Sequence, residues 1–190
     1  AFDMTTIRTT QRTRIAVLAF AILSVVVVQT PANAIPDSSV RDWNLNASNA
    51  IFVTGAQPPQ ASVLHMAMVH GAVYDAVNAI DGGHEGYLLT PKVAQPFDSK
   101  EAAAAAAAHR VLLHLFSAQQ SVLDAQYAVS LAAIPDGSAK TRGIAVGEAA
   151  AVAMLDKRAN DGMDADVPYT PGTLPGQYRP TPPALPPAPP

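Results

Sequence analysis

Residues 58–80, which read PPQASVLHMAMVHGAVYDAVNAI, constrain the fold of this chain more than any other segment. Pro58 and Pro59 can open a helix because a residue of the first turn needs no backbone N–H partner, and Asp81-Gly82-Gly83 provides the stop. The apolar positions of this segment cover most of the helix circumference, which is typical of a helix surrounded by other helices. We therefore expect one long helix with the rest of the chain packed around it.

The first 34 residues have the layout of a secretory signal peptide. From Met4 a basic stretch with three arginines leads into the apolar residues 15–28, and Ala32-Asn33-Ala34 has the small residues of a cleavage site. An uncleaved membrane anchor is the alternative, but residues 15–28 are short for a span of about 20 residues. We expect cleavage after Ala34 and a secreted or periplasmic protein, with no membrane attachment after cleavage.

Charge and cysteine content narrow the classes of function. Residues 35–190 hold 9 basic and 14 acidic residues, a net charge of −5, and no run of Lys or Arg follows Arg41. We therefore expect no nucleic-acid partner. The chain has no cysteine, which excludes thiol catalysis and thiolate metal sites, so packing of the core has to hold the domain together.

Local signals divide the remaining chain into further helices. Residues 43–55 can form a first short helix, with Trp43 and Phe52 as its anchors. Residues 98–101 resemble a capping box and lead into seven alanines, and this helix should reach Phe116. The Ser-x-x-Gln pattern at 117–120 predicts a helix that ends at Pro135, with little polar face.

One more helix is expected from residue 140 to residue 159, after Asp136-Gly137-Ser138. Gly143 and Gly147 inside it are tolerated best where another backbone comes close. Residues 81–97 are rich in Gly and Pro and predict a surface loop, and the proline-rich residues 167–190 predict an extended tail. The chain thus divides into a leader at 1–34, an all-α domain of four to five helices at 35–166, and a tail at 167–190.

Five histidines are candidates for a metal site. His65/His70 and His109/His114 share a spacing of five residues, which places the two rings of each pair about 140° apart on a helix, so they do not converge on one ion. We expect packed or partly exposed histidines, and no metal ligands. The acidic run Asp161, Asp164 and Asp166 lacks the glutamate of an EF-hand, and a solvated loop is the expectation there.

A polar seam runs along the helix expected at residues 58–80. His70, Tyr74 and Asn78 lie four residues apart, and we expect them to form a structural network. The alternative is an acid/base pair of His70 with Asp75, but these two lie five apart and no nucleophile stands beside them. The glycines at 82, 83 and 86 do not have a phosphate-binding spacing. We assign no catalytic, cofactor-binding or metal-binding residue.

Several segments together resemble a known family. LHMAMVHGAVYDAVNAI, followed by a glycine-rich loop and Tyr87, is similar to the N-terminal half of bacterial vanadium-dependent haloperoxidase-like proteins of the PAP2 phosphatase superfamily. Trp43 and Asn44, the alanine run ending in AAHRVLLHLF, the stretch from YAVSLAAIPDG to DKRANDG, and PGQYRPTPPA follow in the order that this family shows.

The resemblance implies a helical scaffold and a chemistry carried elsewhere. A complete member oxidises halide with peroxide and vanadate, or hydrolyses phosphate monoesters. It uses Lys…Arg-Pro, Pro-Ser-Gly-His and Arg…His motifs in its C-terminal half. None of the three occurs in these 190 residues, and Arg179-Pro180 lacks a lysine at the right distance. We carry over no catalytic residue and no cofactor, vanadate being implied only for a complete member.

Two hypotheses follow, and they leave open whether the chain is an enzyme. In the first, the chain is the helical scaffold half of a haloperoxidase-like PAP2 protein and has a C-terminal catalytic half as partner. In the second, it is a freestanding secreted binding or assembly module, which pairs its apolar helices with another chain or with its own copy. A small metal-binding helical protein is a third alternative.

Overall fold

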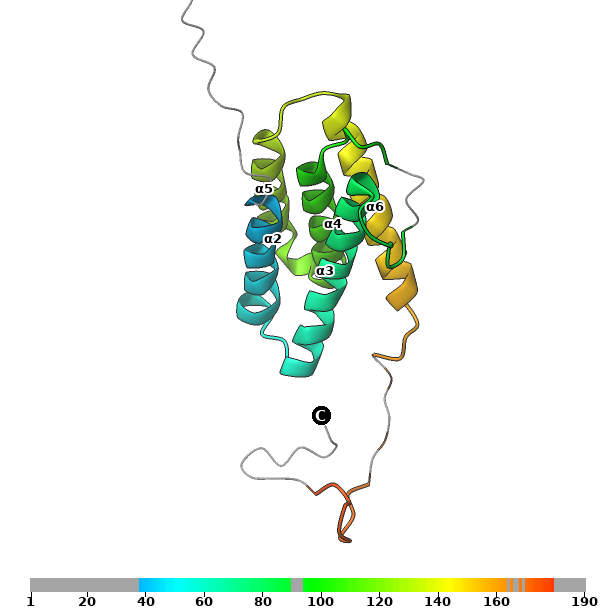
Figure 1. Cartoon of the computed structure of the whole chain (residues 1–190). Coiled ribbons are helices and arrows are strands. Elements are labelled where there is room, and N and C mark those ends of the chain that lie inside the picture. Colours follow the sequence, from blue (N-terminus) through cyan, green and yellow to red (C-terminus); the bar gives the residue numbers. More distant parts are fainter. Residues whose placement is uncertain (1–37, 90–93, 164, 166–167, 169, 180–190) are drawn as a thin grey trace, which may run out of the picture. The chain divides into compact units, whose positions relative to one another are not determined.

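The computed structural model describes residues 38–89, 94–163, 165, 168 and 170–179 of the 190-residue chain (Figure 1). All the regular secondary structure within these residues is helical. The elements in chain order are α2 (Ser38–Ser48), the π-helix η1 (Asn49–Thr54), α3 (Pro59–Asp81), α4 (Lys100–Leu115), the 3₁₀-helix η3 (Ser117–Gln119), α5 (Gln120–Ala132) and α6 (Ser138–Arg158). The expected all-α bundle of four to five helices is confirmed.

Helix α3 has the boundaries that its proline and glycine residues predict. Pro58 is the N-cap residue, with an extended backbone at φ −62° and ψ 154°, and Pro59 is the first helical residue. At the other end, Gly82 has a left-handed backbone at φ 70°, and its N–H donates to the carbonyl of Asn78 over 2.7 Å. This conformation costs glycine little because it has no Cβ.

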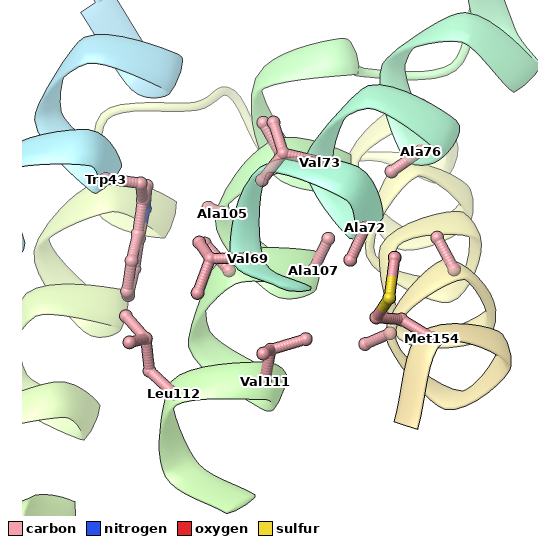
Figure 2. Packing of buried hydrophobic residues seen from close by; sticks show 14 of the residues in the cluster. Trp43, Val69, Ala72, Val73, Ala76, Ala105, Ala107, Val111, Leu112 and Met154 are labelled. Carbon is pink, nitrogen blue, oxygen red and sulfur yellow. The ribbon is translucent and has the colours of Figure 1, made fainter. Parts of the chain in front are cut away.

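The centre of the bundle is α4, and the expectation that residues 58–80 form it was wrong. Helix α4 packs against α2, α3, α5 and α6, and residues 102–108 are completely buried. In α3, Val63 and Leu64 remain 66% and 36% exposed. Alanine takes the central position because its small side chain lets four helices approach one axis. Figure 2 shows Ala105 and Ala107 of α4 among Val69 and Ala72 of α3 and Met154 of α6.

Helices α4 and α6 approach closely enough that two positions in α6 require glycine. A Cβ on Gly143 would overlap the carbonyl oxygen of Ser99, and one on Gly147 would overlap that of Ala103. A Cβ on Gly147 would also lie 2.7 Å from the Cβ of Ala106. The close backbone approach expected for these two glycines is confirmed.

The first helical segment runs to Gly55 as expected, but only one of its two aromatic anchors is buried. Trp43 is 1% exposed, and its Nε1 donates to Ser130 Oγ of α5 over 3.2 Å. Phe52 is 49% exposed, whereas Ile51 beside it is fully buried. The segment continues as the π-helix η1 after Ser48, and its wider turn changes which residue faces the core.

Several helix starts differ from expectation. Helix α2 begins at Ser38, five residues before the expected start at Trp43. Ser99, and not Asp98, is the N-cap of α4, where its Oγ accepts from the N–H of Ala102. Asp98 is buried and binds Arg142 Nε of α6 over 2.6 Å. Ser117 opens η3 without a side-chain cap on either short helix, so the capping role expected for it was wrong. Helix α6 begins two residues earlier than expected.

Some segments lie partly or wholly outside the described residues. The expected leader at 1–34 lies outside the described residues, as do residues 180–190 of the expected extended tail. Within the described part of the tail the chain turns back, since the N–H of Gly172 donates to the carbonyl of Tyr178 over 3.2 Å. A search of the described helices finds none with both the length and the apolar character needed to cross a bilayer.

Candidate functional site

The polar residues of α3 meet the loop that follows the helix. Asp75 is 1% exposed, and its carboxylate accepts three backbone N–H groups. Oδ1 accepts from Tyr87 over 2.5 Å, and Oδ2 accepts from Leu88 over 2.7 Å and from Leu89 over 3.0 Å. A carboxylate can be buried without a cation when its lone pairs are filled in this way. Asp75 therefore fixes the path of residues 87–89.

Two further side chains of α3 hold the same loop. The amide of Asn78 donates from Nδ2 to the carbonyl of His84 over 2.7 Å and accepts the His84 N–H at Oδ1 over 3.0 Å. Tyr74 donates its hydroxyl proton to the carbonyl of Glu85 over 2.7 Å. We call Tyr74, Asp75 and Asn78 the loop clamp. The clamp pairs side chains of one helix with main-chain groups of residues 84–89.

Gly86 lies within the clamped loop. A Cβ at this position would overlap the carbonyl oxygen of Leu89 and lie 3.6 Å from Asp75 Oδ1. The loop thus needs a glycine at this position because its own backbone approaches closely. The clamp and this glycine together make the loop a fixed part of the domain.

The expected network of His70, Tyr74 and Asn78 was wrong in its connections. None of the hydrogen bonds described for these three side chains joins two of them. His70 Nε2 instead lies 2.9 Å from Asn44 Oδ1 of α2, and the other two bind the loop. The alternative acid/base pair is also not formed, because Asp75 is occupied by the three N–H groups of the loop. The seam joins α3 to its neighbours.

A groove of about 400 Å³ lies beside this seam. Its lining contains the apolar side chains of Val40, Val73 and Val77 and the polar groups of His70, Tyr74, Asn78, Asp81 and His84. The carboxylate of Asp81 is bound by Lys100 Nζ over 2.5 Å, which lowers the pKa of Asp81 below its ordinary value of 3.8. The groove therefore has both apolar and polar lining, and its one carboxylate is paired with Lys100.

A second polar cluster joins α4 to α5. His109 Nε2 lies 2.7 Å from Asp124 Oδ1, and the imidazole stacks on the Tyr127 ring with centroids 4.3 Å apart. The hydrogen bond from His109 lowers the pKa of Asp124 below 3.8, although burial acts in the opposite direction. Burial raises the pKa of Tyr127, and the charge of Glu148 adds to this effect. The indole of Trp43 contacts both rings edge-on.

Sequence reasoning did not find Asp124 as the partner of His109. One signal was present: Asp124 is the single charged residue between positions 117 and 135, in a segment that otherwise reads as apolar or neutral. A lone charge in such a segment indicates a specific partner. The partner itself lies fifteen positions away on another helix, so no local spacing pointed to it.

The other histidines have separate surroundings. His65 is buried and meets the ring of Phe116 edge-on at 5.4 Å, whereas His70 faces Asn44. His114 lines an open cavity of about 440 Å³ between the ends of α4 and α6. The rings of each pair thus point to different neighbours, as their spacing predicts. No group of three His, Asp or Glu side chains in the described part of the chain is arranged to hold a metal ion.

Only part of the acidic run after α6 lies within the described residues. Asp161 binds Arg158 Nη2 over 2.5 Å and accepts the N–H of Met163 over 2.9 Å, so it closes the turn that ends the helix. Asp164 and Asp166 lie outside the described residues.

Taken together, the described residues define an all-α helical bundle with a clamped loop, a groove of mixed polarity beside it, and a pair formed by the buried His109 and the half-exposed Asp124. Comparison of the chain with protein-family models, with curated proteins and with solved structures finds no match.

Proposed function

We propose that this chain is the helical scaffold half of a secreted, vanadium-dependent haloperoxidase-like protein of the PAP2 superfamily. Its role is to support a catalytic half that carries the Lys…Arg-Pro, Pro-Ser-Gly-His and Arg…His motifs. The complete protein would oxidise halide with peroxide and vanadate, or hydrolyse phosphate monoesters. Two observations support the proposal: the sequence resembles this family, and residues within the resembling segment form the loop clamp.

The loop clamp is the observation that carries this proposal. The YDAVN stretch, which is central to the resemblance, uses Tyr74, Asp75 and Asn78 to fix main-chain groups of residues 84–89. These three side chains are occupied by hydrogen bonds to the main chain of the loop. The YDAVN stretch thus holds the following loop in a fixed position, which is a structural role and fits the scaffold half of a larger protein.

The test has two parts, starting with the encoding locus. We expect the sequence beyond the codon for Pro190 to contain the three motifs in one of its frames. The absence of all three from every frame would contradict the proposal. In the second part, the chain alone and the chain joined to that segment are assayed for bromide oxidation with vanadate and peroxide, and for phosphate monoester hydrolysis.

The joined protein should show one of the two activities, and the chain alone should show neither. An Asp75→Asn variant of the joined protein should lose activity through displacement of residues 84–89. An Asp156→Asn variant, changed at an exposed site of α6, is the matched control. Halogenation by residues 35–190 alone would refute the assignment.

A freestanding binding or assembly module is the second candidate, and one surface favours it. Phe52 and Val53 of η1 are 49% and 72% exposed, and Val63 and Leu64 in the first turns of α3 are 66% and 36% exposed. Large apolar side chains gathered at one connection indicate a contact surface. Light scattering separates the candidates: a stable oligomer of the folded chain favours the module, and aggregation favours the isolated half.

A further inference from the structure

Helix α5 is attached to the rest of the bundle by few buried side chains. Leu123 is the single buried residue among its thirteen. By contrast, ten of the sixteen residues of α4, eleven of the twenty-three of α3 and six of the twenty-one of α6 are buried. Burial of apolar side chains is the main term that holds a helix to its neighbours. The hydrophobic attachment of α5 is therefore the weakest among these four helices.

Polar and aromatic contacts with two buried rings add to this attachment. Nε2 of His109 in α4 lies 2.7 Å from Asp124 Oδ1, and the imidazole stacks on Tyr127. The indole of Trp43 in α2 donates to Ser130 Oγ over 3.2 Å. Because the Asp124 side chain is 47% exposed, water competes for its carboxylate, and the pair contributes less than a buried pair would. These contacts position α5 without making it as stable as its neighbours.

The segments on either side of α5 are fastened to other elements. Before the helix, Gln119 Nε2 donates to the carbonyl of Ala50 in η1 over 3.0 Å. After the helix, Lys140 Nζ of α6 donates to the carbonyl of Ile134 over 3.2 Å and to Asp136 Oδ1 over 2.9 Å. Neither η3 nor α5 has a side-chain N-cap. The segment that can separate without disturbing these anchors is therefore α5 itself.

We propose that α5 opens from the folded domain as a unit while α3, α4 and α6 stay packed. A separate helix of thirteen residues is marginal in water, so the detached segment loses its own hydrogen bonds. Opening brings Trp43 and His109, which are 1% and 8% exposed in the closed state, to the surface. Helix α5 is thus a strap that covers or uncovers two buried rings. The inference goes beyond the proposed function and does not depend on it.

Native-state hydrogen exchange of the full chain measures this opening. The N–H groups of residues 124–132 find their helical acceptors within α5. They should exchange at least about tenfold faster than those of residues 106–112 in α4. Low concentrations of urea should change their rate little, because opening of one short helix exposes little surface. Exchange at the α4 rate and with the α4 dependence on urea would overturn the proposal.

A pair of substitutions separates local from global opening. Leu123→Ala removes the one buried side chain of α5 and should accelerate exchange of residues 124–132 at least about tenfold. Val146→Ala, at a position of α6 that is 1% exposed, should accelerate exchange in α4 and α6. It should leave residues 124–132 unchanged, because the contacts of Val146 persist when α5 alone is open. Equal acceleration of α4 and α5 by Val146→Ala would refute local opening.

Limited proteolysis of the full chain gives a second, independent measurement. Chymotrypsin cleaves after large apolar and aromatic residues, and α5 offers Leu123, Tyr127 and Leu131. Cleavage inside a helix requires that the helix open, so its rate follows the population of the open state. Among the cuts inside α3, α4, α5 and α6, the first should fall in α5. A first cut inside α3, α4 or α6 with α5 intact would contradict the proposal.

Discussion

Replacement of Gly147 by alanine tests the close approach of α4 and α6. An added Cβ would overlap the carbonyl oxygen of Ala103 and would lie 2.7 Å from the Cβ of Ala106 and 2.9 Å from the backbone nitrogen of Ala107. Two of these three obstacles are backbone atoms of a buried helix, which cannot rotate away. The helices have to separate instead, and the alanine contacts between them are lost along their length.

The expected loss of stability follows from two opposing terms. Alanine in place of glycine within a helix stabilises it by roughly 1 kcal/mol. Overpacking of a close-packed core costs about 1–3 kcal/mol, and the upper end applies here because backbone atoms obstruct the new methyl group. The net change for Gly147→Ala is a loss of about 2 kcal/mol in the free energy of unfolding.

Gly71→Ala in α3 is the matched control. The helix-propensity term is the same, but the nearest obstacle is Cε of Met154 at 2.5 Å, the end of a flexible side chain. Met154 can adopt another rotamer, so the cost is offset by the gain and the net change is close to zero. The two substitutions should therefore differ by about 2 kcal/mol although they change the same atoms.

Urea unfolding measures this difference, with Trp43 as the probe. Trp43 is the only tryptophan of the chain and is 1% exposed, so its fluorescence reports loss of the core. With a slope of about 2 kcal/mol per molar urea, Gly147→Ala should lower the midpoint by about 1 M. A Gly147→Ala midpoint at or above that of the unaltered chain would refute the argument for backbone contact.

Three further predictions follow from single contacts. Asp75→Asn should destabilise the fold by about 2–3 kcal/mol, because the amide accepts at one oxygen where the carboxylate served three N–H groups; hydrogen exchange at residues 87–89 should accelerate, and unchanged protection would contradict the clamp. Ser99→Ala should cost about 1 kcal/mol through loss of the α4 cap, read from urea unfolding. The pKa of Asp124 is lowered in the folded state, so its contribution to stability is present above the ordinary pKa of 3.8 and is lost as the pH falls through the lowered value. Asp124→Asn should therefore reduce the loss of stability as the pH falls below the ordinary pKa of 3.8, and an identical acid profile would argue against the pair.

Local sequence signals predict the all-α class and both ends of α3. Pro58 and Gly82 bound α3, Ser99 caps α4, and the two glycines of α6 lie at its contact with α4. These signals act within one turn of the chain, through missing N–H groups, left-handed backbone and side-chain caps. Because these signals are local, the all-α class and both ends of α3 were predicted correctly, whereas the start of α2, the N-cap of α4 and the capping role of Ser117 were not.

Which side chains pair with each other depends on the packing of the helices. The sequence gives no spacing between His70 and Asn44, or between His109 and Asp124, because these partners lie on different helices. It also does not show that α4 is the central helix, since an apolar circumference in α3 is compatible with partial exposure. Burial and pairing depend on contacts between distant segments, and these form only when the helices pack together. The residues of the candidate site could therefore be singled out from the sequence, but their partners could be identified only from the packed structure.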